Sequence, residues 1–181
     1  MLAITVYFLE HDPALIERRL HVGPAAERER SQQIIQTVAS ALTCAVFIVP
    51  GLDHRFGWSP QLDPRWPIGG DAMAAAGFLM MFLAFRENTH AAATVGVEQG
   101  QRVVSSGPYR VVRHPMYAGA VLLFLATPVA LGSLWGLIPA TALVGVIAVR
   151  LLDEERYLAA HLPGYTSYCE TVTTRLLPGV W

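Results

Sequence analysis

Three long apolar runs constrain the fold of this chain more than any other feature of its sequence. They cover residues 33–51, 69–86 and 117–150. A helix over the 19 residues of the first run rises roughly 28 Å, close to the ~30 Å hydrocarbon core of a bilayer. The first two runs therefore predict membrane-spanning helices at 33–51 and 69–86.

The third run is too long for one crossing, because a single helix over residues 117–150 would extend about 51 Å. Its middle holds Pro128, Gly132, Ser133, Gly136 and Pro139, which disfavour a continuous helix. The run therefore predicts a helical hairpin that turns near residues 132–136. We expect an all-α, polytopic integral membrane protein with about four transmembrane helices.

Composition narrows the alternatives. The 181 residues are 53% hydrophobic and only 15% charged, with a mean hydropathy of +0.39, which excludes a disordered chain. The formal net charge of −1 argues against a nucleic-acid binder, which needs a basic face. A soluble helical bundle is the remaining alternative, but three uncharged stretches are difficult to bury in a chain of this length.

The cysteines and the N-terminus add little chemistry. Cys44 lies in an apolar run and Cys169 in a polar one, with no CxxC or Cys/His cluster, so we expect free thiols and no metal site. Residues 1–9 are apolar but lack the basic start and the cleavage site of a signal peptide. They are too short to span a bilayer and are compatible with the tail of a truncated spanning helix.

The basic residues, all of them arginine, predict the orientation of the chain. If residues 10–32, 86–116 and 150–181 share one side of the membrane, that side holds 11 of the 13 arginines, and only Arg55 and Arg65 lie on the other. The positive-inside rule makes the first side cytoplasmic. The arrangement is self-consistent only if 117–150 is a hairpin.

We therefore expect one domain over residues 1–181. Residues 10–32 form a cytoplasmic amphipathic segment, whose helix starts at Asp12-Pro13. Residues 87–116 form a cytoplasmic loop that carries motifs, and residues 151–181 form a cytoplasmic tail that completes the site.

Most reactive side chains gather in three clusters on the predicted cytoplasmic side. The first, residues 107–119, combines aromatic, cationic and imidazole groups, and places His114 before Pro115. In the second, residues 150–158, Arg150 and Glu154 share one helix face. The third runs from residue 164 to 181. Interfacial anchoring and a surface ion pair are the alternative interpretations of these residues.

The three clusters, in this order, resemble the isoprenylcysteine carboxyl methyltransferase family, which has many bacterial members. The resemblance covers roughly residues 10–181. It rests on residues 107–109, 113–117, 119, 154, 155, 158, 165, 168 and 175–181. Phospholipid N-methyltransferases and membrane sterol reductases share parts of this pattern. No GxGxxG motif follows a strand and no P-loop is present, so a nucleotide-like cofactor would need a pocket built from loops and helix ends.

The resemblance implies an S-adenosylmethionine-dependent methyltransferase in a multi-pass protein of the bacterial inner membrane, with its site facing the cytoplasm. It implies catalytic roles for Arg150, Glu154 and His114, with Arg150 contacting an amphiphilic or small acceptor. The cofactor-binding residues would be Gln101, Arg102, Val103, Val104, Tyr109, His114, Pro115, Met116, Tyr117 and Glu154. Glu154 could pair with a cationic group of the cofactor, and His114 or an arginine with its carboxylate.

Three alternatives remain open from the sequence. In the first, the protein is a methyltransferase whose acceptor is a phospholipid amine rather than a carboxylate. In the second, it is a nicotinamide-dependent reductase on a related helical scaffold. In the third, it is a membrane scaffold whose arginines only anchor it.

Overall fold

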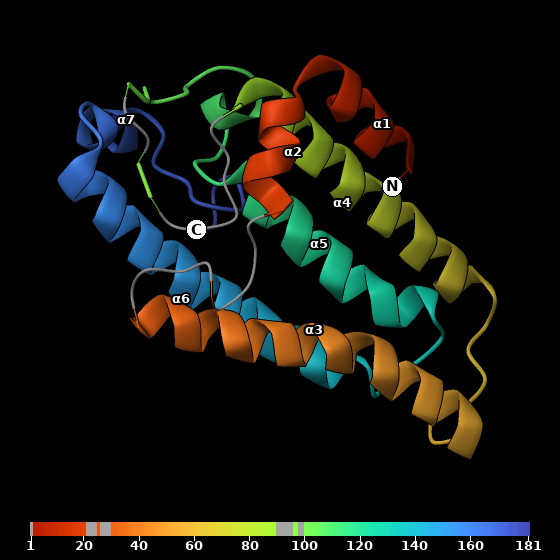
Figure 1. The fold of residues 1–181 in the computed structure, drawn as a ribbon. Coiled ribbons are helices and arrows are strands. Elements are labelled where there is room, and N and C mark those ends of the chain that lie inside the picture. The colour runs from red at the N-terminus through yellow and green to blue at the C-terminus, as the bar shows by residue number, and fades with distance from the viewer. Residues whose placement is uncertain (1, 21–24, 26–29, 90–95, 98–99) are drawn as a thin grey trace.

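The computed structural model describes residues 2–20, 25, 30–89, 96–97 and 100–181, and this part of the chain is helical without strands. The all-α prediction is therefore confirmed for these residues. The elements are α1 (Leu2–His11), α2 (Pro13–Leu20), α3 (Arg30–Phe56), α4 (Arg65–Glu87), the 3₁₀ helix η2 (Gly107–Arg110), α5 (Pro115–Ala130), α6 (Leu137–His161) and α7 (Tyr165–Thr171) (Figure 1).

Helices α3 and α4 are long and apolar enough to cross a membrane. They contain the predicted runs 33–51 and 69–86, and they extend beyond them, so the connection between them shortens to residues 57–64. Only 11% of the apolar window of α3 and 22% of that of α4 is buried in the protein. Large apolar side chains such as Ile34, Phe47 and Leu79 are therefore exposed, as expected for helices that face lipid.

Two helices, α5 and α6, occupy the third apolar run, and residues 131–136 connect them. Pro128 and Pro139, which we expected to help break the run, both lie inside helices. Pro139 falls in the first turn of α6, where a missing N–H costs little, and Pro128 falls in the last turn of α5. Since α5 has only 16 residues and α6 carries several charges, four membrane crossings stay a prediction.

Helices α4 and α5 run side by side, and glycines let their backbones approach closely (Figure 1). A Cβ on Gly77 would lie 2.8 Å from the carbonyl oxygen of Gly119, and a Cβ on Gly119 would lie 2.8 Å from that of Gly77. Packing through small residues is typical of helices that associate in a bilayer. This contact fixes the start of α5, which carries part of the candidate site.

The main core lies between α3, α5 and α6. It contains Val46, Leu143, Ile147 and Leu151, and Tyr117 at the start of α5 packs against it. A second cluster, made of Leu162, Tyr165, Tyr168 and Val172, holds α7 near the end of α6. Together the two clusters include residues from all three sequence clusters, namely Tyr117, Leu151 and Tyr165.

At the opposite end of α6, a buried carboxylate ties the end of α3 to the connection between α5 and α6. Asp53 accepts hydrogen bonds from the backbone N–H and the hydroxyl of Ser59, both at 2.6 Å, and from the hydroxyl of Ser133. The Ser133 hydroxyl oxygen in turn accepts the N–H of Gly136 at 3.1 Å. These contacts fix the turn of the hairpin.

The predicted helix start at Asp12-Pro13 is confirmed. Pro13 is the first residue of α2, and the Asp12 side chain accepts the N–H of Leu15 at 3.0 Å, which is the geometry of an N-terminal cap. Most of the remaining predicted segment, residues 21–24 and 26–29, lies outside the described residues.

Candidate functional site

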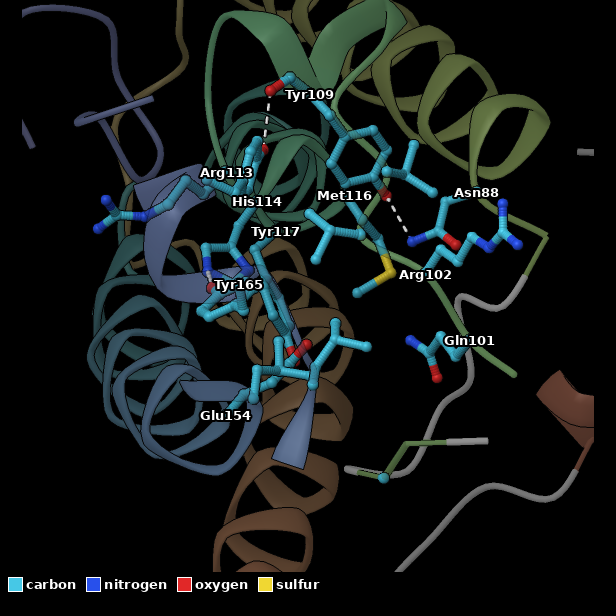
Figure 2. Close-up of a pocket in the computed structure, with 16 residues that line it drawn as sticks. Asn88, Gln101, Arg102, Tyr109, Arg113, His114, Met116, Tyr117, Glu154 and Tyr165 are labelled. Carbon is cyan, nitrogen blue, oxygen red and sulfur yellow. Dashed lines mark hydrogen bonds between the residues drawn. The ribbon is translucent and has the colours of Figure 1, made fainter. Parts of the chain in front are cut away.

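A pocket opens where the start of α5, the end of α6, α7 and the segment 101–104 meet (Figure 2). Its walls carry four tyrosines, two arginines, a histidine, a glutamate, two amides and several apolar side chains. The lining residues are Asn88, Gly96, Gln101, Arg102, Val103, Val104, Tyr109, Arg113, His114, Met116, Tyr117, Glu154, Leu158, Leu162, Tyr165 and Tyr168.

The structure brings together all but one of the residues that the family resemblance assigned to a cofactor. Gln101, Arg102, Val103, Val104, Tyr109, His114, Met116, Tyr117 and Glu154 all line this pocket. Pro115 does not line it; it begins α5 and is fully buried, so it shapes the backbone. Arg150 lies behind the wall and reaches the pocket through Tyr117.

A chain of hydrogen bonds joins Glu154 in the pocket to α3. The Tyr117 hydroxyl donates to Glu154 Oε2 at 2.5 Å, and Arg150 Nε donates to the Tyr117 oxygen at 3.3 Å. Arg150 also donates to Gln36 Oε1 at 2.7 Å. Since Arg150 and Glu154 are one helical turn apart, α6 presents both to the same side, as the sequence spacing predicts.

Tyr109 forms another part of the wall, on η2. Pro108 favours the start of this short helix. Gly107 adopts a φ of +54°, a backbone conformation that residues with a Cβ rarely adopt. Burial raises the pKa of Tyr109 to about 12, partly offset by a hydrogen bond from Asn88 at 3.4 Å. Its phenol is therefore neutral at physiological pH and presents an aromatic face and a hydroxyl to the pocket.

Glu155, the neighbour of Glu154, points to a different set of partners. Its Oε1 accepts Arg113 Nε at 2.7 Å and His114 Nε2 at 3.1 Å, and its Oε2 accepts Arg175 Nε at 2.8 Å. Burial alone would raise the pKa of Glu155, but hydrogen bonds from His114 and Arg175 and the charge of Arg113 lower it to about 2. Glu155 is therefore ionised and accepts hydrogen bonds without donating any.

Arg113 extends this cluster to the C-terminal segment. Its NH1 donates to the carbonyls of Val172 at 3.0 Å and Thr173 at 3.3 Å, and its backbone N–H donates to Thr174 at 2.9 Å. In Figure 2 its guanidinium points away from the open pocket. Arg113 therefore holds the tail against the site.

The tail also contributes pocket residues that sequence reasoning did not assign a role. Tyr165 and Tyr168 line the pocket, and Tyr168 donates to the carbonyl of Tyr109 at 2.7 Å. Burial raises the pKa of both hydroxyls, so they stay protonated. Their motif was visible in the sequence, but its contact with residues 109–114 depends on the fold.

Two other residues had no sequence signal for a place near the site. Arg19 of α2 donates to the Met116 sulfur at 3.3 Å, and its guanidinium lies 4.2 Å from the Phe85 ring centroid. Asn88, just after α4, lines the pocket. Neither residue could be assigned to a site from the sequence, because Arg19 is one of several arginines in its segment and Asn88 is a single asparagine after a helix.

A family model described as phospholipid methyltransferase matches residues 66–163, more than half of the chain. The matched range starts in α4, contains Glu154 and the segment 101–117, and ends two residues before α7. A search of the curated proteins finds no match.

Proposed function

Because this chain belongs to the phospholipid methyltransferase family, we propose that it transfers a methyl group from S-adenosylmethionine to an amphiphilic acceptor at a membrane. The family is part of a superfamily of membrane methyltransferases that includes the isoprenylcysteine carboxyl methyltransferases. The observation that carries the proposal is the convergence of the 101–104 segment, Tyr109, His114, Tyr117 and Glu154 in one pocket.

The residues of the pocket fit the chemical groups of this cofactor, which offers a sulfonium, an ammonium, a carboxylate and an adenine. Glu154 uses Oε2 to accept from Tyr117, and its Oε1 makes no hydrogen bond within the described residues, so it can accept from an ammonium. Tyr109 and Tyr117 offer aromatic faces to an adenine or a sulfonium. Arg102 and Gln101 offer donors to a carboxylate.

When bound, S-adenosylmethionine supplies an activated methyl group for an in-line displacement. The protein contributes alignment and the exclusion of water. Arg150, buried and held by Tyr117 and Gln36, is positioned behind the pocket to orient an anionic group of the acceptor through its planar guanidinium. The exposed apolar surfaces of α3 and α4 support an acceptor that approaches from lipid, while a soluble cofactor enters from water.

The predicted orientation places this pocket on the cytoplasmic side. Arg113 and Arg175 lie beside the pocket, whereas Arg55 and Arg65 lie near the connection between α3 and α4. The positive-inside rule applies to this separation of the arginines, and it predicts that the pocket faces the cytoplasm.

The first experiment measures binding of S-adenosylhomocysteine to the detergent-solubilised protein by calorimetry. We expect binding by the wild type and at least a tenfold weaker affinity for Glu154→Gln, about 1.4 kcal/mol, because the charged acceptor is lost. Glu170→Gln, an exposed glutamate on α7, is the matched control and should bind as the wild type does. Absence of binding by the wild type would refute the proposed function.

The second experiment identifies the acceptor. Membranes that contain the protein are incubated with labelled S-adenosylmethionine, and the labelled product is identified by mass spectrometry. A base-labile methyl group indicates a carboxylate acceptor, and a base-stable one indicates an amine such as a phospholipid headgroup. A spectral change on adding NADPH and lipid, without methyl transfer, would support the reductase alternative instead.

A further inference from the structure

The geometry points to a proton-accepting role for His114, with Glu155 as the residue that fixes its tautomer. We propose that Glu155 keeps the imidazole proton on Nε2, so that the bare Nδ1 faces the pocket and takes up the proton that the acceptor loses on methylation. This inference rests on the proposed function. It assigns the proton-transfer step to His114, which contacts Glu155 through Nε2 and also lines the pocket.

The Nε2 atom of His114 faces a carboxylate. It lies 3.1 Å from Glu155 Oε1 and 3.5 Å from the hydroxyl of Tyr165. An ionised carboxylate has no proton to donate, so the nitrogen that faces it must carry one. Arg113 and Arg175 fix the same carboxylate from two sides, which leaves Glu155 little freedom to turn away.

The other ring nitrogen of His114, Nδ1, has no partner among the described residues. In a neutral imidazole whose Nε2 carries the proton, Nδ1 has a free lone pair and accepts a hydrogen bond. Nδ1 forms no hydrogen bond with the residues that the structure describes, and it is not one of their buried polar atoms that lack a partner. His114 lines the pocket, so this nitrogen is accessible from the pocket side.

The His114–Glu155 pair resembles the arrangement that enzymes use to activate a histidine. A carboxylate that binds one ring nitrogen orients the imidazole and stabilises the imidazolium that forms when the other nitrogen takes a proton. Among the described residues, Glu155 and Tyr165 lie within hydrogen-bond distance of His114, and the ring centroid of Tyr117 lies 5.8 Å from that of His114. Arg113 and Arg175 bind the same Glu155 carboxylate, and Glu154, the other carboxylate of the pocket, accepts from Tyr117. Glu155 is therefore the carboxylate in direct contact with His114, and its negative charge stabilises an imidazolium there.

Methylation of an acceptor atom that carries a proton releases that proton. The acceptor atom forms a bond to the methyl carbon, the carbon–sulfur bond breaks with its electron pair left on sulfur, and the proton released by the acceptor atom passes to Nδ1. A nucleophile that carries a proton, such as an amine nitrogen, needs this group, whereas a carboxylate does not. A proton acceptor at His114 therefore favours an amine over a carboxylate as the methyl acceptor.

The test reads the tautomer directly, without cofactor or acceptor. Protein with ¹⁵N-labelled histidine in detergent is studied by NMR at neutral pH, and the His114 signals are assigned from their loss in His114→Gln. We expect a proton on Nε2 and none on Nδ1 in the wild type, retained in Glu155→Asp and lost in Glu155→Gln as the tautomers mix. A proton on Nδ1 in the wild type would overturn the inference.

Kinetics separate this role from a merely structural one. In Glu155→Gln, kcat should fall at least about 10²-fold, as for loss of a general base, while the Kd for S-adenosylhomocysteine changes less than about threefold. Glu155→Asp should recover most of the rate, and His161→Gln, an exposed histidine on α6, should match the wild type. A Kd that rises in proportion to the loss of kcat would overturn the role in proton transfer.

The two proposals fail separately. If the wild type neither binds S-adenosylhomocysteine nor transfers a methyl group, the proposed function is wrong, whatever tautomer His114 adopts. If the wild type is active and the NMR spectrum shows a protonated Nδ1, the proposed function stands and the inference about His114 is wrong.

Discussion

Two buried carboxylates, at opposite ends of α6, use different kinds of partner. Asp53 is 3% exposed and is bound by the hydroxyls of Ser59 and Ser133 and by one backbone N–H. Glu155 has a side chain that is 13% exposed and is bound by Arg113, Arg175 and His114. Both tie together segments that are far apart in the chain.

The difference indicates which end of α6 is suited to chemistry. Hydroxyls and an amide satisfy Asp53 with neutral groups of fixed protonation, which suits a structural turn. At Glu155, two arginines and a titratable imidazole surround one carboxylate, and two of these partners, Arg113 and His114, also line a pocket. Concentrated charge beside a pocket with shifted pKa values is typical of functional sites, whereas a saturated carboxylate at a turn is typical of architecture.

The largest expected effect comes from removing the charge at the pocket end. Glu155→Leu leaves Arg113, Arg175 and His114 without their carboxylate and should lower the free energy of unfolding by about 3 kcal/mol or more. Thermal unfolding in detergent measures this loss, and Glu170→Leu on the exposed side of α7 is the control. Equal stability of Glu155→Leu and wild type would mean that the charge cluster is not a stabilising feature.

Acidification should weaken the pocket end selectively. The pKa of Glu155 is lowered to about 2 in the folded protein, so its contribution to stability is complete above the ordinary value of 4.5 and is lost as the pH falls toward 2. The unfolding temperature of the wild type should therefore drop in this window more steeply than that of Glu155→Gln. Parallel curves for the two proteins would contradict this account.

A smaller effect is expected at the turn. Ser133→Ala removes a fully buried hydroxyl that donates to Asp53 and accepts from Gly136, and it should cost about 1–2 kcal/mol of stability. Binding of S-adenosylhomocysteine should stay within about twofold of the wild type, because the turn is at the other end of α6. A large loss of affinity in Ser133→Ala would show that the two ends are coupled.

The smallest effect is expected for Arg175→Lys. The side chain of Arg175 is 30% exposed, and lysine retains the charge opposite Glu155 while losing the guanidinium stacked near Trp181. We expect a change below about 1 kcal/mol in thermal unfolding. Arg175→Gln, which removes the charge, should cost more, and the reverse order would indicate that shape rather than charge holds the tail.

Much of the helical layout was predictable, because hydrophobic runs of fixed length are a local property. The predicted runs 33–51 and 69–86 lie within α3 and α4, and the hairpin turn falls at residues 131–136. The place of Pro128 inside α5 was less predictable, because a proline there removes one backbone hydrogen bond and the local sequence disfavours it, whereas the structure buries the ring fully. Family motifs also identified nine of the residues that line the pocket.

The different orientations of Glu154 and Glu155 were not predictable from their neighbouring positions. One residue of helix rotates the side chain by about 100°, so Glu154 faces Tyr117 while Glu155 faces Arg113, and which face meets which partner depends on how α5, α6 and the tail pack. The same holds for Arg19 and Asn88. The packing of α2 brings Arg19 to Met116, and the packing of α4 brings Asn88 to the pocket.

The sequence by itself determined that this chain is helical and apolar, which family it resembles and which motifs carry its reactive groups, since these depend on composition, periodicity and local spacing. Only the tertiary structure decided which of those groups meet. Residues 113–114 and 174–175 are about sixty positions apart, yet their backbones are hydrogen-bonded, and the side chains of Arg113, His114 and Arg175 share the Glu155 carboxylate. Contacts of that kind form only when non-local packing brings the segments together, and no local pattern encodes them.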